Sequence, residues 1–581
     1  MLKEYIDFKI KILDSVGASS MYYSTISLRR LAKIFILKSI FFEHSCKKES
    51  DMSDNKSFWE KEEKHLDARV HEAIWPGGQK AIDRLKKQGK RPVRELIQEL
   101  IDPETQFFEL SRIAGFGVNY PGGIDDVPCA GLVTGIGKIN GNWTMIFGND
   151  SRVKAGAYFP ITLKKHIRAQ AIAERCGLNC VYIADSGGAF LPMQADVFPD
   201  DGHFGSMFYN IARMSAKGLK QITMSTGGNT AGGAYIVFMA CQSVMIDKMS
   251  YSFLGGPPLV KMATGEEISA EDLGGAKIHT HVSGGCDHFC GDQSEAVQKV
   301  REILALEPPQ KMHLHRYAEM PPSVHSQNIY DLLPASTHQG IDGRKFLEAI
   351  ADDSYFIEYK QHYAPGRGDN ILAGKIRIKG IPIGVIASNS VGIIFAEAAQ
   401  KAAEWIVRCS QEKIPLLFVQ NAPGYMVGSE SEHQGIGKYG SDMVRAVSCA
   451  QVPRIQLVIG PDNGAANYGM CGRAYRPHFL FSTMRARTGV MSGRSAAGVL
   501  LSIEANKRKA KGQPMTDSEK QAFREKMIEK HDNEAHPFFC GARILNDRVL
   551  KFSEIRDWLA MAFEVSLLAP IGEPAFGNVR F

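Results

Sequence analysis

Short apolar runs that favour β-strands alternate with helix-compatible segments along most of the chain, and the strand-like runs end in stretches of small residues. Val181–Asp185 (VYIAD) follows a predicted helix over Ile161–Arg175 and leads into Ser186–Ala189 (SGGA). Leu219–Ser225 is a second apolar run, and it leads into Gly227–Tyr235 (GGNTAGGAY). Strands that alternate with helices indicate β-α-β crossovers, so the pattern predicts an α/β fold with layered sheets.

The second half repeats this order. Asp185 precedes Ala231 by 46 residues, and Gln420 precedes Ala465 by 45 residues. Such a repeat of strand, loop, helix, strand and Gly-rich helix start predicts an internal duplication of one α/β unit. The elements expected in the second half are paired β runs over Leu372–Ala387, a helix over Phe395–Cys409, strands over Leu416–Gln420 and Arg454–Ile459, and a Gly-rich stretch over Gly460–Met470. The matching β runs of the first half lie over Ala130–Gly148 and flank Asn140-Gly141, a hairpin signal.

Proline-spaced residues 306–334 separate the two halves. A chain of 581 residues is too long for one ordinary core. We therefore expect an N-terminal domain over residues 57–320 and a C-terminal domain over residues 321–581. Helices are predicted over Ser57–Val70 and over Ile74–Asp102, the second with a break around Gly89 and Pro92.

Residues 1–51 form an atypical N-terminal extension. Ser27–Phe42 (SLRRLAKIFILKSIFF) is basic and apolar, as in part of a transit peptide, but Glu4, Asp7 and Asp14 lie upstream of it. A conventional soluble start begins at Met52. We expect the working protein to begin there and to reside in the cytoplasm, with the mitochondrial matrix as the alternative.

Composition narrows the classes of function. The chain is 44% hydrophobic and 23% charged, with a net charge of +6 and both signs interspersed. It has no basic stripe with interleaved aromatic residues, so we expect no nucleic-acid partner. The chain contains no run of 18 apolar residues, so we expect no membrane span. The 11 cysteines include no Cys-x-x-Cys, so we expect reduced thiols and no metal site.

Gly227–Tyr235 and Gly460–Met470 point to a specific chemistry. Glycines allow a sharp turn and close approach of a ligand to the backbone. If a helix begins near Gly232, its first N–H groups have no partner inside the helix. Such donors would hold a thioester oxygen as it gains charge, and two such loops suggest two oxyanion sites. The alternative is a pair of ordinary Gly-rich turns.

Several long segments resemble one family. They are Asp185–Gly205, Asn229–Tyr235, Gly255–His279, Ile414–Gly428 and Asn467–Tyr475. These segments are similar to those of the carboxyltransferase (β) subunits of biotin-dependent acyl-CoA carboxylases, of the 3-methylcrotonyl-CoA carboxylase type. The resemblance covers roughly Ser57 to Phe581.

The resemblance implies two tandem crotonase-like domains and a hexamer with active sites between subunits. Acyl-CoA would dock mainly on the N-terminal domain, and carboxybiotin would enter along the C-terminal domain. Biotin would be carried by a partner subunit with biotin carboxylase activity, and only that partner would use ATP and Mg. The sequence has no biotin-attachment Met-Lys-Met and no Gly-x-x-x-x-Gly-Lys-Ser/Thr loop.

Site residues also follow from the resemblance. Gly232, Gly233 and Ala234 would form one oxyanion hole, and Gly464, Ala465 and Ala466 the other. Which loop faces the thioester and which faces biotin stays open. Lys261 and Thr264 would contact substrate or belong to a surface turn, and Phe190 and Tyr425 would shape a pocket or belong to the core. The candidate substrate-binding residues are Gly187, Gly188, Ala189, Phe190, Lys261, Thr264 and Tyr425.

The second loop departs from the family pattern. Where the methylcrotonyl type usually reads Gly-Ser-Tyr-Gly-Ala-Gly-Asn, this chain has Asn463 in place of Tyr and Ala466 in place of Gly. Because of these changes, the resemblance does not decide which acyl-CoA is the substrate. The alternatives to 3-methylcrotonyl-CoA are propionyl-CoA or another acyl-CoA, a decarboxylase subunit of the glutaconyl-CoA type, and a non-catalytic acyl-CoA-binding paralogue.

Overall fold

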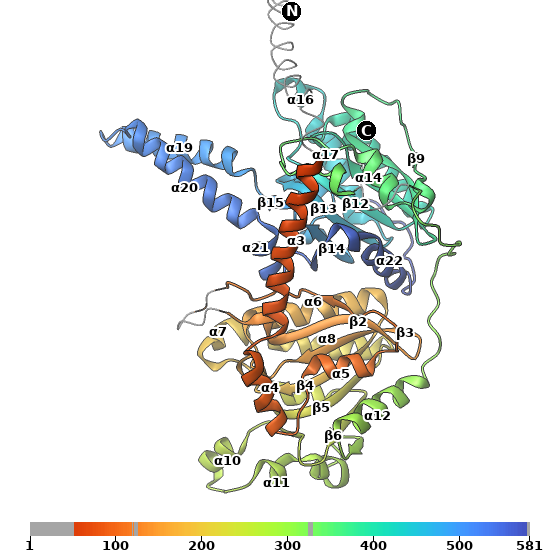
Figure 1. Ribbon diagram of the computed structural model, residues 1–581, viewed down its shortest axis with the longest axis vertical. Coiled ribbons are helices and arrows are strands. Elements are labelled where there is room, and N and C mark those ends of the chain that lie inside the picture. The colour runs from red at the N-terminus through yellow and green to blue at the C-terminus, as the bar shows by residue number, and fades with distance from the viewer. Residues whose placement is uncertain (1–51, 119, 121–125, 324–328, 578–581) are drawn as a thin grey trace, which may run out of the picture. The chain divides into compact units, whose positions relative to one another are not determined.

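Each half of the chain builds a sheet, and the two sheets have the same strand order (Figure 1). The structure is a computed structural model, and it describes residues 52–581 except 119, 121–125, 324–328 and 578–581. The chain divides into two units, residues 1–58 and 59–581. Both sheets belong to the second unit. The extension predicted over residues 1–51 lies outside the described residues.

The first sheet has eight strands in the order β1-β2-β3-β4-β5-β6-β8, with β7 paired to the end of β5. The β1–β2 and β2–β3 pairs are antiparallel, and the pairs from β3 to β8 are parallel. The strands are β1 (Phe108–Leu110), β2 (Leu132–Ile139), β3 (Asn142–Asn149), β4 (Asn179–Ser186), β5 (Gln221–Thr230), β6 (Gln242–Ile246), β7 (Tyr251–Phe253) and β8 (His288–Cys290).

The second sheet repeats this arrangement strand for strand, in the order β9-β10-β11-β12-β13-β14-β16, with β15 paired to the end of β13. The strands are β9 (Ile357–Glu358), β10 (Ile371–Ile378), β11 (Ile381–Ser388), β12 (Leu416–Ala422), β13 (Arg454–Asn463), β14 (Phe479–Thr483), β15 (Arg487–Gly489) and β16 (Arg548–Leu550). The predicted duplication is therefore present in the fold.

Local sequence explains the main elements. Val181, Tyr182 and Ile183 of β4 are all buried, as expected for a parallel strand that is covered on both faces. Helix α6 (Pro160–Cys176) starts with proline at its first position and is followed by Gly177, which caps it with φ of +67°. Both are typical helix boundaries because proline needs no N–H donor there and glycine accepts a left-handed backbone.

Matching helices connect matching strands. Helix α6 joins β3 to β4, and α15 (Ala396–Gln411) joins β11 to β12. Helix α8 (Phe204–Ala216) leads into β5, and α17 (Ile436–Cys449) leads into β13. Short helices α9 (Gly232–Phe238) and α18 (Ala465–Gly469) follow β5 and β13.

The halves differ most between their last two strands. The first half has α10 (Pro257–Thr264), α11 (Ala270–Gly274) and the π-helical turn Ile278–Val282 there. The second half instead has α19 (Gly493–Ala510) and α20 (Asp517–Ala535), which pack side by side and extend away from the sheet, followed by α21 (Pro537–Ala542) (Figure 1).

The remaining helices flank the sheets. They are α3 (Met52–Ile74), α4 (Gly78–Lys87), α5 (Val93–Leu100), α7 (Gln194–Val197), α12 (Gln293–Ala305), α13 (Ile329–Leu332), α14 (Gly343–Ile350), α16 (Ser429–His433) and α22 (Ile555–Ser566). The predicted break around Gly89 and Pro92 separates α4 from α5.

The structure corrects one expectation, on the Gly-rich loops, and does not test another, on the domain boundary. Gly227–Thr230 and Gly460–Asn463 were expected in loops, but they are the ends of β5 and β13 because pairing with β7 and β15 extends both strands. The domain boundary at residues 320/321 stays a prediction. Trp558 of α22 packs against both Phe108 of the first sheet and Phe481 of the second, so the hydrophobic core is shared between the halves.

Candidate active site

The two Gly-rich stretches adopt the same strand–turn–helix geometry. Strand β5 ends at Thr230, Ala231 turns the chain with φ of +52° and ψ of −116°, and α9 begins at Gly232. Strand β13 ends at Asn463, Gly464 turns the chain with φ of +56° and ψ of −142°, and α18 begins after it. The backbone therefore matches Ala231 with Gly464, one residue earlier than the sequence spacing indicated.

Hydrogen bonds fix both turns in the same way. The N–H of Ala231 donates to the carbonyl of Phe253 at 3.0 Å, and the N–H of Gly464 donates to the carbonyl of Gly489 at 3.0 Å. Three residues further on, the N–H of Ala234 bonds back to Ala231 at 3.1 Å, and that of Asn467 bonds back to Gly464 at 3.1 Å.

This pattern leaves two adjacent donors in each loop. The N–H groups of Gly232 and Gly233, and those of Ala465 and Ala466, form no hydrogen bond within the described part of the chain. The six residues expected to form oxyanion holes stay a prediction. Within it, the free donors are these four N–H groups, because those of Ala234 and Gly464 are engaged in the turns.

A second segment lies against each turn. The N–H groups of Gly187 and Phe190 donate to the carbonyls of Ala155 and Tyr158, at 3.3 and 3.0 Å, which holds residues 187–190 beside the end of β4. A side chain at Gly188 would lie 2.9 Å from the carbonyl oxygen of Thr230. Gly188 therefore lies against the first loop, and substrate binding by Gly187, Gly188 and Ala189 stays a prediction.

Tyr425 occupies the position in the second half that Ala189 has in the first. Ala189 bridges to Tyr158, and Tyr425 bridges to Ile394 in the same parallel manner. The ring of Tyr425 packs behind α18, since a side chain at Gly469 would collide with its hydroxyl. Burial raises the pKa of Tyr425 well above its ordinary value. Phe190 likewise stacks on Phe159, with ring centroids 4.4 Å apart.

Lys261 and Thr264 are not brought to the loops by any contact among the described residues. Both are exposed on α10. The ammonium group of Lys261 pairs with Glu267 at 2.5 Å, and the hydroxyl of Thr264 donates to the carbonyl of Val260 at 2.9 Å. A substrate contact by either residue therefore stays a prediction.

A polar pair supports each strand end, partly buried in the first half and buried in the second, and sequence reasoning missed both pairs. Lys90 donates to Asp185 at 2.8 Å, beneath Gly227. In the second half, Arg485 donates to Asn421 at 2.6 Å, beneath Gly460. The only signal in the sequence was the glycine of each strand, where any side chain would collide with the pair.

Asp462 is a further residue that the sequence did not single out. It is buried below the second turn, where its carboxylate accepts hydrogen bonds from the Asn467 amide at 2.8 and 2.9 Å and from the Thr488 hydroxyl at 3.0 Å. Burial raises the pKa of Asp462 to about 6, although the hydrogen bonds from Asn467 and Thr488 lower it. The matching residue of the first half is Asn229, a neutral amide.

Neither a metal cluster nor a membrane-spanning helix occurs among the described residues, and one cavity lies away from the loops. No group of three or more His, Cys, Asp or Glu side chains with metal-binding geometry occurs in residues 52–581 outside the gaps. No helix in the same residues is long and apolar enough to cross a membrane. A cavity of about 560 Å³ lies between α15 and α17, but none of the predicted loop residues lines it.

The matched loops gain a chemical meaning from comparison with known proteins. Residues 84–577 match the model of the carboxyl transferase domain family. The chain belongs to this family. The methylcrotonoyl-CoA carboxylase beta chain, mitochondrial, of Arabidopsis thaliana is 43% identical over 89% of this chain and 87% of its own length. The biotin-dependent 3-methylcrotonyl-coenzyme A carboxylase beta1 subunit of Mycobacterium tuberculosis is 40% identical, over 89% of this chain and 96% of its own.

A solved structure supports the same assignment. The beta subunit of the Pseudomonas aeruginosa geranyl-CoA carboxylase superposes with a TM-score of 0.78 at 32% identity, covering 91% of this chain and 98% of that one. Membership of the carboxyl transferase family confirms the predicted α/β class with two tandem crotonase-like domains. It also confirms the predicted enzyme class, the carboxyltransferase component of biotin-dependent acyl-CoA carboxylases.

Proposed function

We propose that this chain transfers a carboxyl group from carboxybiotin to 3-methylcrotonyl-CoA, with biotin carried by a partner subunit. The observation that carries the proposal is the pair of matched loops, each presenting two adjacent N–H donors, in a chain 40–43% identical to methylcrotonoyl-CoA carboxylase beta chains. Carboxylation of an acyl-CoA passes through an enolate, whose charge rests on the thioester oxygen. The N–H groups of Gly232 and Gly233 would receive that oxygen.

The second loop suits the carbonyl oxygen of biotin. The N–H groups of Ala465 and Ala466 are fixed by the turn at Gly464, so they need no rearrangement to accept an oxygen atom. Biotin, when bound, supplies the carboxyl group to be transferred. Each pre-oriented donor is typically worth roughly 3–4 kcal/mol of barrier. No side chain of this chain is assigned as a base.

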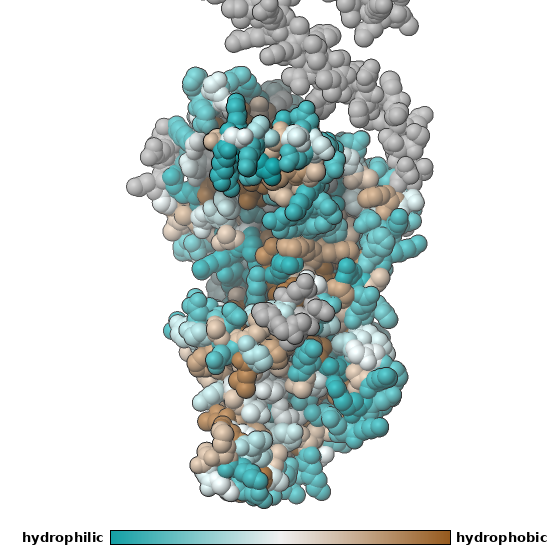
Figure 2. All heavy atoms as spheres, turned by 90° about the vertical axis from the view of Figure 1, so that its left-hand side faces the viewer, coloured by the Kyte–Doolittle hydropathy of each residue, from teal (hydrophilic) through white to brown (hydrophobic). Residues whose placement is uncertain are grey.

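Exposed apolar side chains surround both loops. Leu191 follows the segment beside the first loop and is 76% exposed, and Val427 follows the matching segment of the second half and is 79% exposed. Tyr235 of α9 and Tyr468 of α18 are also exposed. Figure 2 shows hydrophobic side chains among hydrophilic ones on one face of the molecule. Exposed large apolar side chains beside both loops support a hexamer in which neighbouring subunits cover the loops.

The partner and the compartment belong to the same proposal. We expect a separate subunit with biotin carboxylase and biotin carrier activity, which alone uses ATP and Mg. The Arabidopsis relative is named mitochondrial and the mycobacterial relative is not. The names of the mitochondrial relatives support the matrix alternative, and the cytoplasm remains our first expectation from the sequence.

The reverse half-reaction tests the function without the partner. Purified protein is mixed with free biotin and 3-methylglutaconyl-CoA or, separately, methylmalonyl-CoA, and release of the decarboxylated acyl-CoA is followed. Turnover with 3-methylglutaconyl-CoA alone supports the proposal. Turnover with methylmalonyl-CoA alone would move the substrate to propionyl-CoA. A folded hexamer that turns over neither would favour a different acyl chain or a non-catalytic paralogue.

A further inference from the structure

A polar cavity of about 120 Å³ lies away from both loops. It is bordered by residues 111–113 of the first half, by β16 of the second half and by α3. One water molecule takes up about 30 Å³ in the liquid, so the cavity has room for several waters or one phosphate-sized anion. The polar residues that line it are Asp67, Ser111, Arg112, Asn546, Arg548, Lys551 and Glu554.

The cavity contains N–H donors that lack acceptors. The Nδ2 of Asn546 and the Nε of Arg548 are buried and form no hydrogen bond within the described part of the chain, and the Nε of Arg112 has only its ion pair with Glu109 at 3.5 Å. Asn546 is 2% exposed and Arg548 is 7% exposed. Buried donors without acceptors are costly, so two of them on residues that line one cavity indicate a missing acceptor.

The charges of the lining also favour an anion. Lys551 pairs with Asp67 at 2.7 Å, and Arg548 pairs with Glu554 at 3.0 Å, so both lining carboxylates are taken. Arg112 has only Glu109, at 3.5 Å, and Glu109 already pairs with Arg94 at 2.5 Å.

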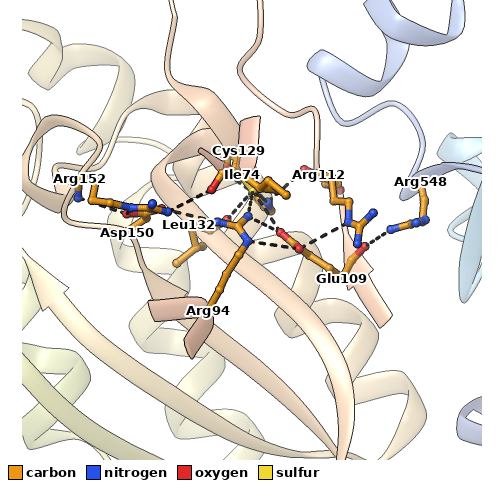
Figure 3. Close-up of polar contacts among 11 residues, drawn as sticks. Ile74, Arg94, Glu109, Arg112, Cys129, Leu132, Asp150, Arg152 and Arg548 are labelled. Atoms are coloured by element: carbon orange, nitrogen blue, oxygen red, sulfur yellow. Dashed lines mark hydrogen bonds and ion pairs between the residues drawn. The ribbon is translucent and has the colours of Figure 1, made fainter. Parts of the chain in front are cut away.

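The two arginines also lie close together. Figure 3 shows the guanidinium groups of Arg112 and Arg548 side by side next to Glu109. Burial and the nearby Arg112 charge lower the pKa of Arg548 to about 10. An anion between the two guanidinium groups would relieve this repulsion.

We propose that this cavity binds a small inorganic oxyanion of the phosphate class, held by Arg112, Asn546 and Arg548. The planar guanidinium groups offer paired donors that match phosphate oxygens. The side chain of Arg112 is one-third exposed, which gives the anion a route from solvent. Arg112 belongs to the first half of the chain, and Asn546 and Arg548 belong to the second. The two halves meet here, since the N–H of Ser111 donates to the carbonyl of Asp547. The bound anion therefore links the two halves.

Equilibrium dialysis of the full chain against radiolabelled inorganic phosphate, at fixed ionic strength in chloride, tests the proposal. We expect saturable binding of about one phosphate per chain at this cavity. Arg112→Gln should weaken it at least tenfold, the typical effect of losing a charged hydrogen bond. Asn546→Asp places a carboxylate in the cavity and should abolish binding there. Arg524→Gln removes an exposed cation on α20 and should leave binding unchanged.

Three results would overturn the proposal. The first is wild-type protein that binds no phosphate. The second is binding by folded Arg112→Gln and Asn546→Asp variants that equals that of Arg524→Gln. The third is competition by unlabelled AMP as strong as by unlabelled phosphate, which would assign the donors to the phosphoryl group of a larger molecule.

Discussion

Single residues distinguish two loops whose backbones are otherwise alike. Below the first turn lies Asn229, opposite Ser252, and below the second lies Asp462, opposite Thr488. Asp462 ties the turn to Asn467 and Thr488, so it holds the Ala465 and Ala466 donors in place. This anchoring carboxyl group is ionised at neutral pH while buried, which costs folding energy.

The pKa of Asp462 predicts how stability depends on pH at this position. The pKa of about 6 in the folded state exceeds the ordinary aspartate value of 3.8, so the folded state binds more protons than the unfolded state between these pH values. The contribution of this group to stability is therefore present below pH 4 and is lost as pH rises through 6, by up to about 3 kcal/mol. Asp462→Asn should remove this loss. Urea unfolding of both proteins at pH 4.5 and 7.5 measures it, and an Asn-minus-Asp difference that does not grow with pH would contradict it.

Backbone strain at the first turn gives a second prediction. Ala231 has φ of +52° and ψ of −116°, a conformation that favours glycine, and the matching residue Gly464 is a glycine. Ala231→Gly should stabilise the protein by about 1 kcal/mol, because relief of strain exceeds the added entropy of the unfolded chain. Gly464→Ala should destabilise it by a similar amount. Denaturant midpoints of the two variants check the opposite signs, and the same sign for both would refute the match.

At the scale of elements, α6 and α15 bury equivalent lysines with different surroundings. Lys165 and Lys401 each lie six residues after the residue that precedes their helix. Lys165 donates to the carbonyls of Ser111 and Cys129, at 3.0 and 3.1 Å. The ammonium group of Lys401 has no hydrogen-bond partner in the described chain, and burial lowers its pKa to about 8.

These two lysines should respond oppositely to substitution by methionine. Below pH 8 the charged form of Lys401 is disfavoured in the fold, at a cost of about 3 kcal/mol that disappears as pH rises from 8 to 10.5. Lys401→Met should therefore raise stability at pH 7 by about 2–3 kcal/mol and lose that advantage near pH 10.5. Lys165→Met should lower stability by a similar amount, because it leaves two buried carbonyls unpaired. Guanidinium unfolding at both pH values measures the effect, and a destabilised Lys401→Met protein at pH 7 would contradict it.

Sequence reasoning succeeded for elements whose signals are local. The Asn140-Gly141 hairpin, helices α6 and α15 and the apolar strands β4 and β12 lie where their patterns predict. It failed where distant residues decide. Lys90 and Asp185 are 95 residues apart, and nothing near either one predicts their ion pair. The sequence spacing paired Ala231 with Ala465. Only the backbone angles show that Ala231 corresponds to Gly464.

At the scale of the whole molecule, the duplicated fold provides two donor pairs, and the proposed function assigns one pair to each of the two ligands between which a carboxyl group moves. The matched hydrogen bonds at Ala231 and Gly464 keep both pairs of N–H groups in the same orientation relative to their sheets. The exposed apolar residues beside each loop predict that neighbouring subunits complete the sites. Light scattering of the purified chain should therefore give the mass of a hexamer, and a monodisperse monomer would contradict this.

The most direct test of the account removes one loop donor without removing a side-chain function. Ala465 is the first residue of α18, where proline is tolerated because its missing N–H has no helical partner. Ala465→Pro and the control Ala465→Ser are compared with wild type in decarboxylation of 3-methylglutaconyl-CoA with free biotin. We predict a loss of about 100-fold or more in kcat for the proline variant and little change for serine. Equal activity of folded, hexameric proline and serine variants would contradict a catalytic role for the second loop.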